Sequence, residues 1–160
     1  MNKNHSIPAT LPKYSETKLP CYVFDIDGTI ADNSHRLHHI KAYKKDWHLY
    51  NSEVEKDTPI TSVINVLSAL SFNNTIILLT GRSESTRAAT ERWLKTHGIE
   101  PDCLLMRDDE DFRKDYEMKS DHIDEIQSSF EILGAFDDNK DVLTMLRLRG
   151  IHTLDCSQIH

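Results

Sequence analysis

The sequence has 160 residues, of which 38% are hydrophobic and 28% charged, and its formal net charge is −7 at pH 7. This length allows one domain with a substantial core but not two ordinary ones, and the composition excludes collagen-like, mucin-like and largely disordered chains. The negative charge disfavours a broad basic surface that grips duplex nucleic acid, so a polyanionic substrate would need a local basic patch.

Residues 1–20 are expected to form an extended or disordered leader, because they hold three of the five prolines and no periodic apolar pattern. No apolar stretch approaches the length of a membrane helix, and the N-terminus lacks the plan of a signal peptide. The three cysteines are widely spaced and lie in or beside apolar segments, which favours buried, reduced thiols. A cytoplasmic protein with no membrane partner is therefore expected.

Short apolar runs alternate with helical patterns along the rest of the chain. Strands are expected at 21–25, 75–80, 103–106, 132–137 and 151–155. Helices are expected at 59–72 behind a cap at Thr58 and Pro59, at 83–98, at 118–130 and at 139–150, and residues 35–50 could also be helical. This alternation predicts an α/β fold with a mostly parallel sheet covered on both faces.

Polar side chains end three of the predicted strands, at Asp25, Thr80 and Asp137. Right-handed crossovers place these strand ends at one edge of the sheet, where ligands bind. Several carboxylates gathered there would repel one another without a cation, and Mg²⁺ suits such oxygen ligands. The predicted metal ligands are Asp25, Asp27, Asp137 and Asp138.

The same group of residues predicts phosphoryl transfer. Thr80 would supply a hydroxyl donor and Lys119 a positive charge to the phosphoryl oxygens. Asp25 would attack phosphorus to form an aspartyl-phosphate, and Asp27 would protonate the leaving oxygen and later activate water. In the turn that follows, Gly28 would permit a sharp exit from the strand, and the Thr29 side chain would hydrogen-bond the turn.

The stretch DIDGTIAD at 25–32 resembles the first motif of the haloacid dehalogenase superfamily, Asp-x-Asp-Gly-Thr. The second motif matches Thr80 in LLTGR, the third matches Lys119, and the fourth matches the acid pair in AFDDN at 135–139. The resemblance implies a three-layer, Rossmann-like parallel sheet of the HAD-like hydrolase type with a minimal cap or none.

A closer likeness is to the 3'-phosphatase domain of phage-type polynucleotide kinase. The signs are an Arg-Lys-Asp segment before the motif lysine, an arginine after the glycine of the second motif, and an arginine eleven residues past the nucleophile. The likeness covers about residues 21–155. It implies that substrate is bound by Gly28, Thr29, Arg36, Gly81, Arg82, Arg113 and Asp115.

The resulting expectation is a phosphatase domain at 21–160 with a small insertion at about 32–58, too short for a separate lid. It would be a Mg²⁺-dependent phosphomonoesterase that removes a 3'-phosphate from nucleic acid ends or nucleotides. Alternatives are a 5'- or 3'-nucleotidase, a generalist small-molecule phosphatase and, more remotely, a non-enzymatic phospho-acceptor. No kinase-type phosphate loop occurs in the sequence, so a separate kinase could be a partner.

One basic and aromatic segment stands out within this insertion, SHRLHHIKAYKKDWHLY at 34–50. Its aromatic side chains could be ordinary packing residues, or they could stack a nucleobase while the lysines hold the backbone. His35 and His39 have helical metal-ligand spacing, but no nearby cysteine or acid completes an obvious zinc set.

Overall fold

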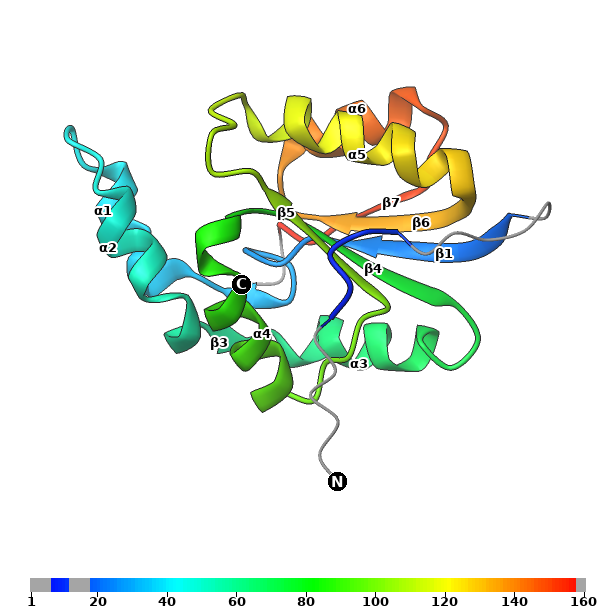
Figure 1. The fold of residues 1–160 in the computed structure, drawn as a ribbon, viewed down its shortest axis with the longest axis horizontal. Coiled ribbons are helices and arrows are strands. Elements are labelled where there is room, and N and C mark those ends of the chain that lie inside the picture. The colour runs from blue at the N-terminus through cyan, green and yellow to red at the C-terminus, as the bar shows by residue number, and fades with distance from the viewer. Residues whose placement is uncertain (1–6, 12–17, 158–160) are drawn as a thin grey trace.

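A computed structural model describes residues 7–11 and 18–157 of the chain. Its main sheet is parallel throughout and has the strand order β5-β4-β1-β6-β7 (Figure 1). The strands are β1 Leu19–Phe24, β4 Thr75–Ser83, β5 Cys103–Arg107, β6 Phe130–Asp137 and β7 Thr153–Asp155. The chain winds outward from β1 in both directions, so the sheet has its switch point at β1, the place where α/β folds bind ligands.

Helices cover both faces of the sheet (Figure 1). One layer contains α3 (Thr61–Leu70) and α4 (Arg87–Thr96), and the other contains α5 (Asp115–Ser129) and α6 (Lys140–Leu148). Neighbouring residues of β1 point into opposite layers, because Val23 belongs to the core cluster under α5 and α6 while Phe24 belongs to the other cluster. The predicted three-layer, Rossmann-like α/β fold is therefore confirmed.

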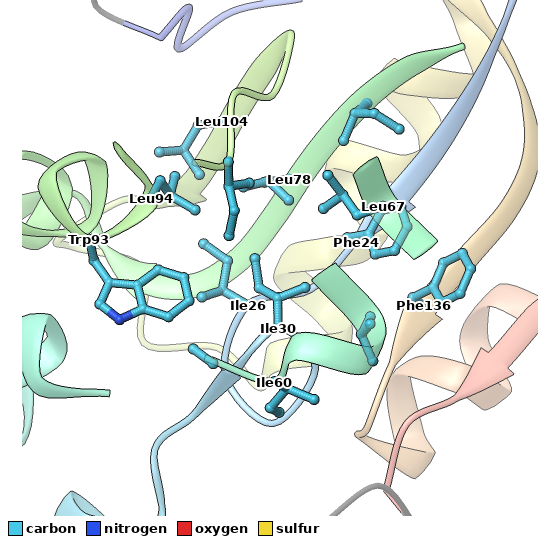
Figure 2. Close-up of a cluster of buried hydrophobic side chains, with 14 of the residues drawn as sticks. Phe24, Ile26, Ile30, Ile60, Leu67, Leu78, Trp93, Leu94, Leu104 and Phe136 are labelled. Carbon is cyan, nitrogen blue, oxygen red and sulfur yellow. The ribbon is translucent and has the colours of Figure 1, made fainter. Parts of the chain in front are cut away.

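The apolar core also fixes the turn that follows β1. Ile26 and Ile30 are fully buried in the cluster with Trp93 and Leu94 of α4 (Figure 2). The carbonyl of Ile26 accepts backbone hydrogen bonds from Thr29, Ile30 and Ala31 at 2.9–3.2 Å. The acids on either side of Ile26 are consequently carried by a turn that is anchored in the core.

The insertion forms a small arm beside the sheet (Figure 1). Its base is an antiparallel pair, β2 Ala31–Asp32 with β3 Thr58–Pro59. Between them lie short helices: the 3₁₀ turn η1 (Ser34–Arg36), α1 (His38–Lys41), α2 (Trp47–Ser52) and the 3₁₀ turn η2 (Val54–Lys56). The helical structure considered for 35–50 is therefore present only in short pieces, since the chain is extended at Ala42 and only re-enters helix after Asp46.

Several predicted element boundaries shift. Thr58 and Pro59 do not cap α3 but pair with β2, and Ile60 takes the N-cap position without a side-chain bond. A 3₁₀ turn, η3 Glu84–Thr86, precedes α4, and α5 begins earlier than predicted because the Glu117 side chain accepts a hydrogen bond from the Lys114 backbone. Within the described residues, no helix has the length and apolar character needed to cross a bilayer.

The described parts of the expected leader contact the fold. Leu19 and Pro20 belong to β1, and the carbonyl of Pro8 accepts a hydrogen bond from Leu104 of the edge strand β5 at 2.9 Å. Ile7 and Leu11 pack against the two core clusters. Residues 1–6 and 12–17, which the same prediction covered, lie outside the described residues.

Candidate active site

Three predicted metal ligands meet at the C-terminal edge of the sheet. Asp25 follows β1 and Asp137 ends the neighbouring β6, and the Asp25 amide donates to the Phe136 carbonyl at 2.9 Å. One carboxylate oxygen from each of Asp25, Asp137 and Asp138 lies within 4.8 Å of the others. Parallel pairing of β1 with β6 therefore brings together acids that are more than 100 residues apart in the sequence.

Lys119 reaches this group from α5, and its side chain is almost fully buried. Its Nζ lies 2.7 Å from Asp25 Oδ1, 2.8 Å from Asp137 Oδ2 and 3.1 Å from Asp115 Oδ2. Burial opposes its positive charge, but Asp137, Asp25 and Asp115 outweigh that effect and raise the pKa of Lys119 well above its ordinary value. The lysine is therefore charged at neutral pH.

The carboxyl groups at this site outnumber the one lysine that they surround, and the pKa of two of them is raised. Burial raises the pKa of Asp25 well above its ordinary value, although Lys119 acts in the opposite direction. Burial, and then the charge of Asp137, raise the pKa of Asp138 to about 6. Buried, closely spaced oxygen donors of this kind fit a hard divalent cation such as Mg²⁺, which would relieve the repulsion.

Asp27 points elsewhere, so its side chain is not a member of the three-carboxylate group that includes Asp25. Its Oδ1 accepts hydrogen bonds from Arg36 Nη2 at 2.6 Å and from Arg82 Nη2 at 2.7 Å. Burial would raise the pKa of Asp27, but the guanidinium groups of Arg82 and Arg36 lower it overall. The Asp27 carboxylate is thus held by two cations, which fix its orientation and favour its ionised form.

Asp57 completes this arrangement and was missed by the sequence analysis. Its Oδ2 lies 2.7 Å from Arg36 Nη2 and 2.6 Å from Arg82 Nη2, while its Oδ1 accepts from Arg36 Nε at 2.7 Å. His35 Nε2 lies 2.9 Å from the same Oδ1. The only available signal was charge balance, because two buried arginines need more than one carboxylate.

Arg36 and Arg82 were predicted to bind substrate, and both are buried, with 0% and 3% of their surface exposed. The hydrogen bonds of their guanidinium groups go to protein atoms: Asp27, Asp57, the Tyr50 carbonyl and the Thr90 hydroxyl. Direct contact with substrate stays a prediction for these two residues. In the structure, Arg36 and Arg82, both also bound to Asp57, hold the Asp27 carboxylate, and this group is called the buried clamp below.

The two motif glycines allow close approach of acidic side chains. Gly28 has φ +82°, and a Cβ there would lie 2.1 Å from Asp138 Oδ2. A Cβ at Gly81 would lie 2.5 Å from Asp115 Oδ1. Thr29 is fully buried, and its hydroxyl has no hydrogen-bond partner within the part of the chain that the structure describes, so the expected side-chain bond to the turn is wrong.

The remaining predicted residues lie around this centre. Thr80 is fully buried at the end region of β4, and its Oγ1 accepts from the Arg82 amide at 3.2 Å. Arg113 is half-exposed, and its guanidinium group forms surface ion pairs with Asp111 at 2.7 Å and Asp121 at 2.8 Å. Its predicted contact with substrate stays untested.

Arg107, at the end of β5, was not predicted. Its Nη2 lies 3.1 Å from Asp115 Oδ1, and its Nε donates to the Gly81 carbonyl at 3.2 Å. Asp115 therefore bridges Arg107 and Lys119, which ties the end of β4 at Gly81 to α5. An arginine at a strand end, among motif residues, was the signal that could have identified it.

Comparison with known proteins was consistent with this geometry. The sequence matches the family model described as the polynucleotide kinase PNKP phosphatase domain over residues 19–160. Comparison with curated proteins gave no match. A haloacid dehalogenase-like hydrolase, SP0104 from Streptococcus pneumoniae, is 17% identical with a TM-score of 0.61, covering 86% of this chain and 84% of that chain, and it supports the fold alone.

Two solved structures of Pnkp1 complexes are more similar. A chain in the Pnkp1/Rnl/Hen1 RNA repair complex is 28% identical with a TM-score of 0.73, covering 92% of this chain and 45% of that chain. A chain in a second Pnkp1/Rnl/Hen1 structure is 27% identical with a TM-score of 0.76, covering 92% and 48%. The present chain thus spans about half the length of these chains.

Proposed function

The chain belongs to the family of the polynucleotide kinase PNKP phosphatase domain and is a phosphatase, and we propose that it removes a terminal 3'-phosphate from a nucleic acid strand or nucleotide. The observation that carries the proposal is the meeting of Asp25, Asp137 and Asp138, the first two of which contact the Lys119 ammonium. Hydrolysis would proceed through an aspartyl-phosphate on Asp25.

In the first step, a carboxylate oxygen of Asp25 forms a bond to phosphorus while the bond from phosphorus to the 3'-oxygen breaks. Asp27 donates the proton that it took from water in the preceding turnover to the departing oxygen, which leaves as a hydroxyl group. Lys119 offsets the charge on the phosphoryl oxygens, and Thr80 supplies a donor. In the second step, Asp27 takes a proton from water, the water oxygen attacks phosphorus, and the Asp25 carboxylate is released with inorganic phosphate.

Mg²⁺ is the proposed cofactor, held by the carboxylates of Asp25, Asp137 and Asp138. When bound, it would neutralise negative charge on the phosphoryl group. Asp27 was also predicted as a ligand, but its carboxylate is engaged by Arg36 and Arg82. In this proposal its side chain therefore serves acid–base chemistry.

The pH dependence of Mg²⁺ binding tests this assignment. The pKa of Asp138 is raised to about 6 and that of Asp25 is raised well above its ordinary value, so both groups hold protons at low pH. A carboxyl must lose its proton before it ligates the metal. Below the pKa of a ligand, the Mg²⁺ affinity should therefore fall with each unit that the pH is lowered, by up to about tenfold for each carboxyl that must release a proton. Titration calorimetry at about pH 5, 6 and 7.5 measures this, and stronger binding at the lowest pH would contradict the ligand assignment.

Asp57→Asn tests the buried clamp. Without the Asp57 charge, two guanidinium groups face Asp27 alone, so the pKa of Asp27 should fall further and a smaller fraction of Asp27 should carry the proton that the leaving oxygen needs. We expect kcat/KM for a nucleoside 3'-phosphate to fall by roughly 100-fold. With p-nitrophenyl phosphate, whose leaving group needs no proton, we expect a loss of less than about tenfold.

The comparison of the two substrates separates positioning from simple loss of structure. A purely structural Asp57 would lower both rates by the same factor, and that result would contradict its role through Asp27. Thermal unfolding of the variant should accompany the kinetics, because removing one partner of a buried ion pair destabilises by about 3–5 kcal/mol. Rates are therefore compared well below the unfolding temperature of the variant.

Substrate choice is tested by phosphate release from three substrates: a 3'-phosphorylated oligonucleotide, its 5'-phosphorylated counterpart and nucleoside monophosphates. We expect the 3'-phosphorylated oligonucleotide to have the highest kcat/KM. The net charge of −7 favours the alternative, a nucleotidase or generalist phosphatase, because it disfavours a polyanion. Preference for mononucleotides would remove the nucleic acid strand from the proposed substrates, and preference for a 5'-phosphate would reject the 3' assignment, while either result would leave the mechanism in place.

Partner proteins are a further part of the proposal. Both Pnkp1 structures are complexes with Rnl and Hen1, and the matched chains are about twice as long as this one. We propose that this phosphatase likewise acts next to other strand-processing proteins, a separate kinase among them. Co-purification of the tagged full chain from its own cells measures this, and recovery of the phosphatase without any stoichiometric protein would contradict it.

A further inference from the structure

The arm formed by α1 and α2 (residues 38–52) carries a basic and aromatic surface that the proposed chemistry does not use. The Tyr43 side chain is fully exposed, at 108%, and Trp47 is 53% exposed. Lys41, Lys44 and Lys45 are also exposed, and Asp46 is the only acid within these residues. In a chain with a net charge of −7, such a surface is locally cationic and is suited to a polyanion.

A row of contacts links this surface to the active site. Arg36, which binds Asp27 at 2.6 Å, lies with its Cζ 4.1 Å from the centroid of the Tyr50 ring. The Tyr50 ring meets the Trp47 ring edge-on at 5.8 Å. The Trp47 ring therefore lies no farther from Arg36 Cζ than the sum of these two distances, about 10 Å.

Lys45 extends the row outward, because its Nζ lies 5.7 Å from the centroid of the Trp47 ring. One exposed ring with an ammonium group beside it is the combination that single-strand binders use, with a base on the ring and a phosphate on the cation. The short path from Asp27 places this pair within reach of the first nucleotides of a strand whose end is at Asp25.

The loop at 108–112 has the opposite charge. Asp108, Glu110 and Asp111 line a shallow hollow there with Phe112 and Arg113. Figure 1 shows this loop and the α1–α2 arm at the same edge of the sheet. The loop leads into α5, and the arm follows β2. Phosphates would be repelled by the acidic loop and attracted by the arm, so the charge distribution gives the strand one direction of approach.

We propose that the α1–α2 arm binds the single-stranded nucleic acid next to the terminal phosphate. Trp47 and Tyr43 stack bases, and Lys41, Lys44 and Lys45 contact backbone phosphates. This inference rests on the proposed function, since it assumes a strand whose 3'-phosphate is at Asp25. It assigns the nucleic acid to a surface of this chain that lies outside the carboxylate group at the C-terminal edge of the sheet.

The test measures binding of a fluorescently labelled, 3'-phosphorylated single-stranded oligonucleotide by anisotropy. Asp25→Asn protein is used so that the substrate persists. We expect Trp47→Ala and Lys44→Glu, each added to Asp25→Asn, to weaken binding about tenfold at low salt. Matched controls are Phe112→Ala, an exposed aromatic on the acidic loop, and Lys95→Glu, an exposed lysine on α4, and both should change Kd by less than twofold.

Hydrolysis separates a failure of this inference from a failure of the proposed function. In the otherwise wild-type protein, Trp47→Ala should lower kcat/KM for the oligonucleotide and leave that for p-nitrophenyl phosphate within about twofold. If the oligonucleotide is cleaved but neither arm variant alters Kd, the arm proposal is overturned and the function stands. If only p-nitrophenyl phosphate is cleaved, the proposal of a 3'-phosphorylated nucleic acid substrate is rejected. An unchanged Kd in the arm variants would then also reject the proposal that the α1–α2 arm binds nucleic acid.

Discussion

Asp25→Asn should abolish phosphate release, with a fall in kcat of at least about 10³-fold. The amide has nearly the same shape as the carboxyl group but cannot form the bond to phosphorus. The fold should persist, because Lys119 keeps Asp137 and Asp115 as partners at 2.8 and 3.1 Å. Steady-state phosphate release and circular dichroism on the same preparation measure the two properties.

The matched control is Asp124→Asn, which removes an exposed carboxylate on α5 that pairs with Arg149. We expect its kcat to stay within about twofold of the wild type, since exposed ion pairs contribute little. Substantial turnover by Asp25→Asn, with purity confirmed by mass spectrometry, would contradict the nucleophile assignment. Loss of activity accompanied by loss of the circular dichroism signal would leave Asp25 as a structural residue and would contradict it too.

Lys119→Met should lower kcat by roughly 10²–10³-fold, because the ammonium that offsets phosphoryl charge is removed. It should also destabilise the metal-free protein by several kcal/mol, since Asp25, Asp137 and Asp115 lose the cation between them. Thermal unfolding with and without Mg²⁺ measures the second effect. The metal should raise Tm more in the variant than in the wild type, because it supplies the missing positive charge.

Lys140→Met is the matched control for Lys119→Met, since Lys140 is an exposed lysine at the start of α6. Its Tm should change little, and its response to Mg²⁺ should equal that of the wild type. An equal Mg²⁺ response in Lys119→Met would contradict the placement of the metal beside Lys119. Full activity in Lys119→Met would contradict its role in the chemistry.

The sequence was sufficient for the sheet and for several polar residues at its edge, but not for Arg107 at the end of β5. Apolar runs that end in Asp25, Thr80 and Asp137 required parallel strands, and parallel strands bring their ends together. Lys119 could be identified from its motif context, although nothing local distinguishes it from a surface lysine. The structure shows it buried against Asp25 and Asp137.

The clamp on Asp27 could not be predicted, because it depends on contacts that no local pattern encodes. Asp57 lies in a short connection between η2 and β3, and its carbonyl accepts a hydrogen bond from Trp93 Nε1 at 2.8 Å. This tertiary contact, and the pairing of β2 with β3, bring Asp57 to Arg36 and Arg82. The sequence analysis therefore identified Arg36 and Arg82 as important residues but did not identify Asp57 as the partner that they share.

The arm illustrates the limit of helical periodicity over short segments. Residues 35–50 contain apolar and polar positions at helical spacing, yet the chain breaks into α1 and α2 around residues 42–46. Isolated helices this short are marginal, so tertiary contacts decide where they begin and end. Here Asp46 caps α2 by accepting a hydrogen bond from the Leu49 amide, and Tyr50 is buried against Arg36.

The account depends on a phosphoryl group that is carried for a time by Asp25. With p-nitrophenyl phosphate as substrate, whose leaving group needs no proton, Asp27→Asn should accumulate this intermediate, because in the proposed mechanism Asp27 activates the water that hydrolyses it. The measurement is rapid mixing of this variant with substrate and Mg²⁺, reduction with borohydride and peptide mass spectrometry. Conversion of residue 25 to homoserine, dependent on substrate and absent in Asp25→Asn, is the predicted result. Product formation with an unmodified residue 25, or reduction at a different aspartate, would contradict the mechanism.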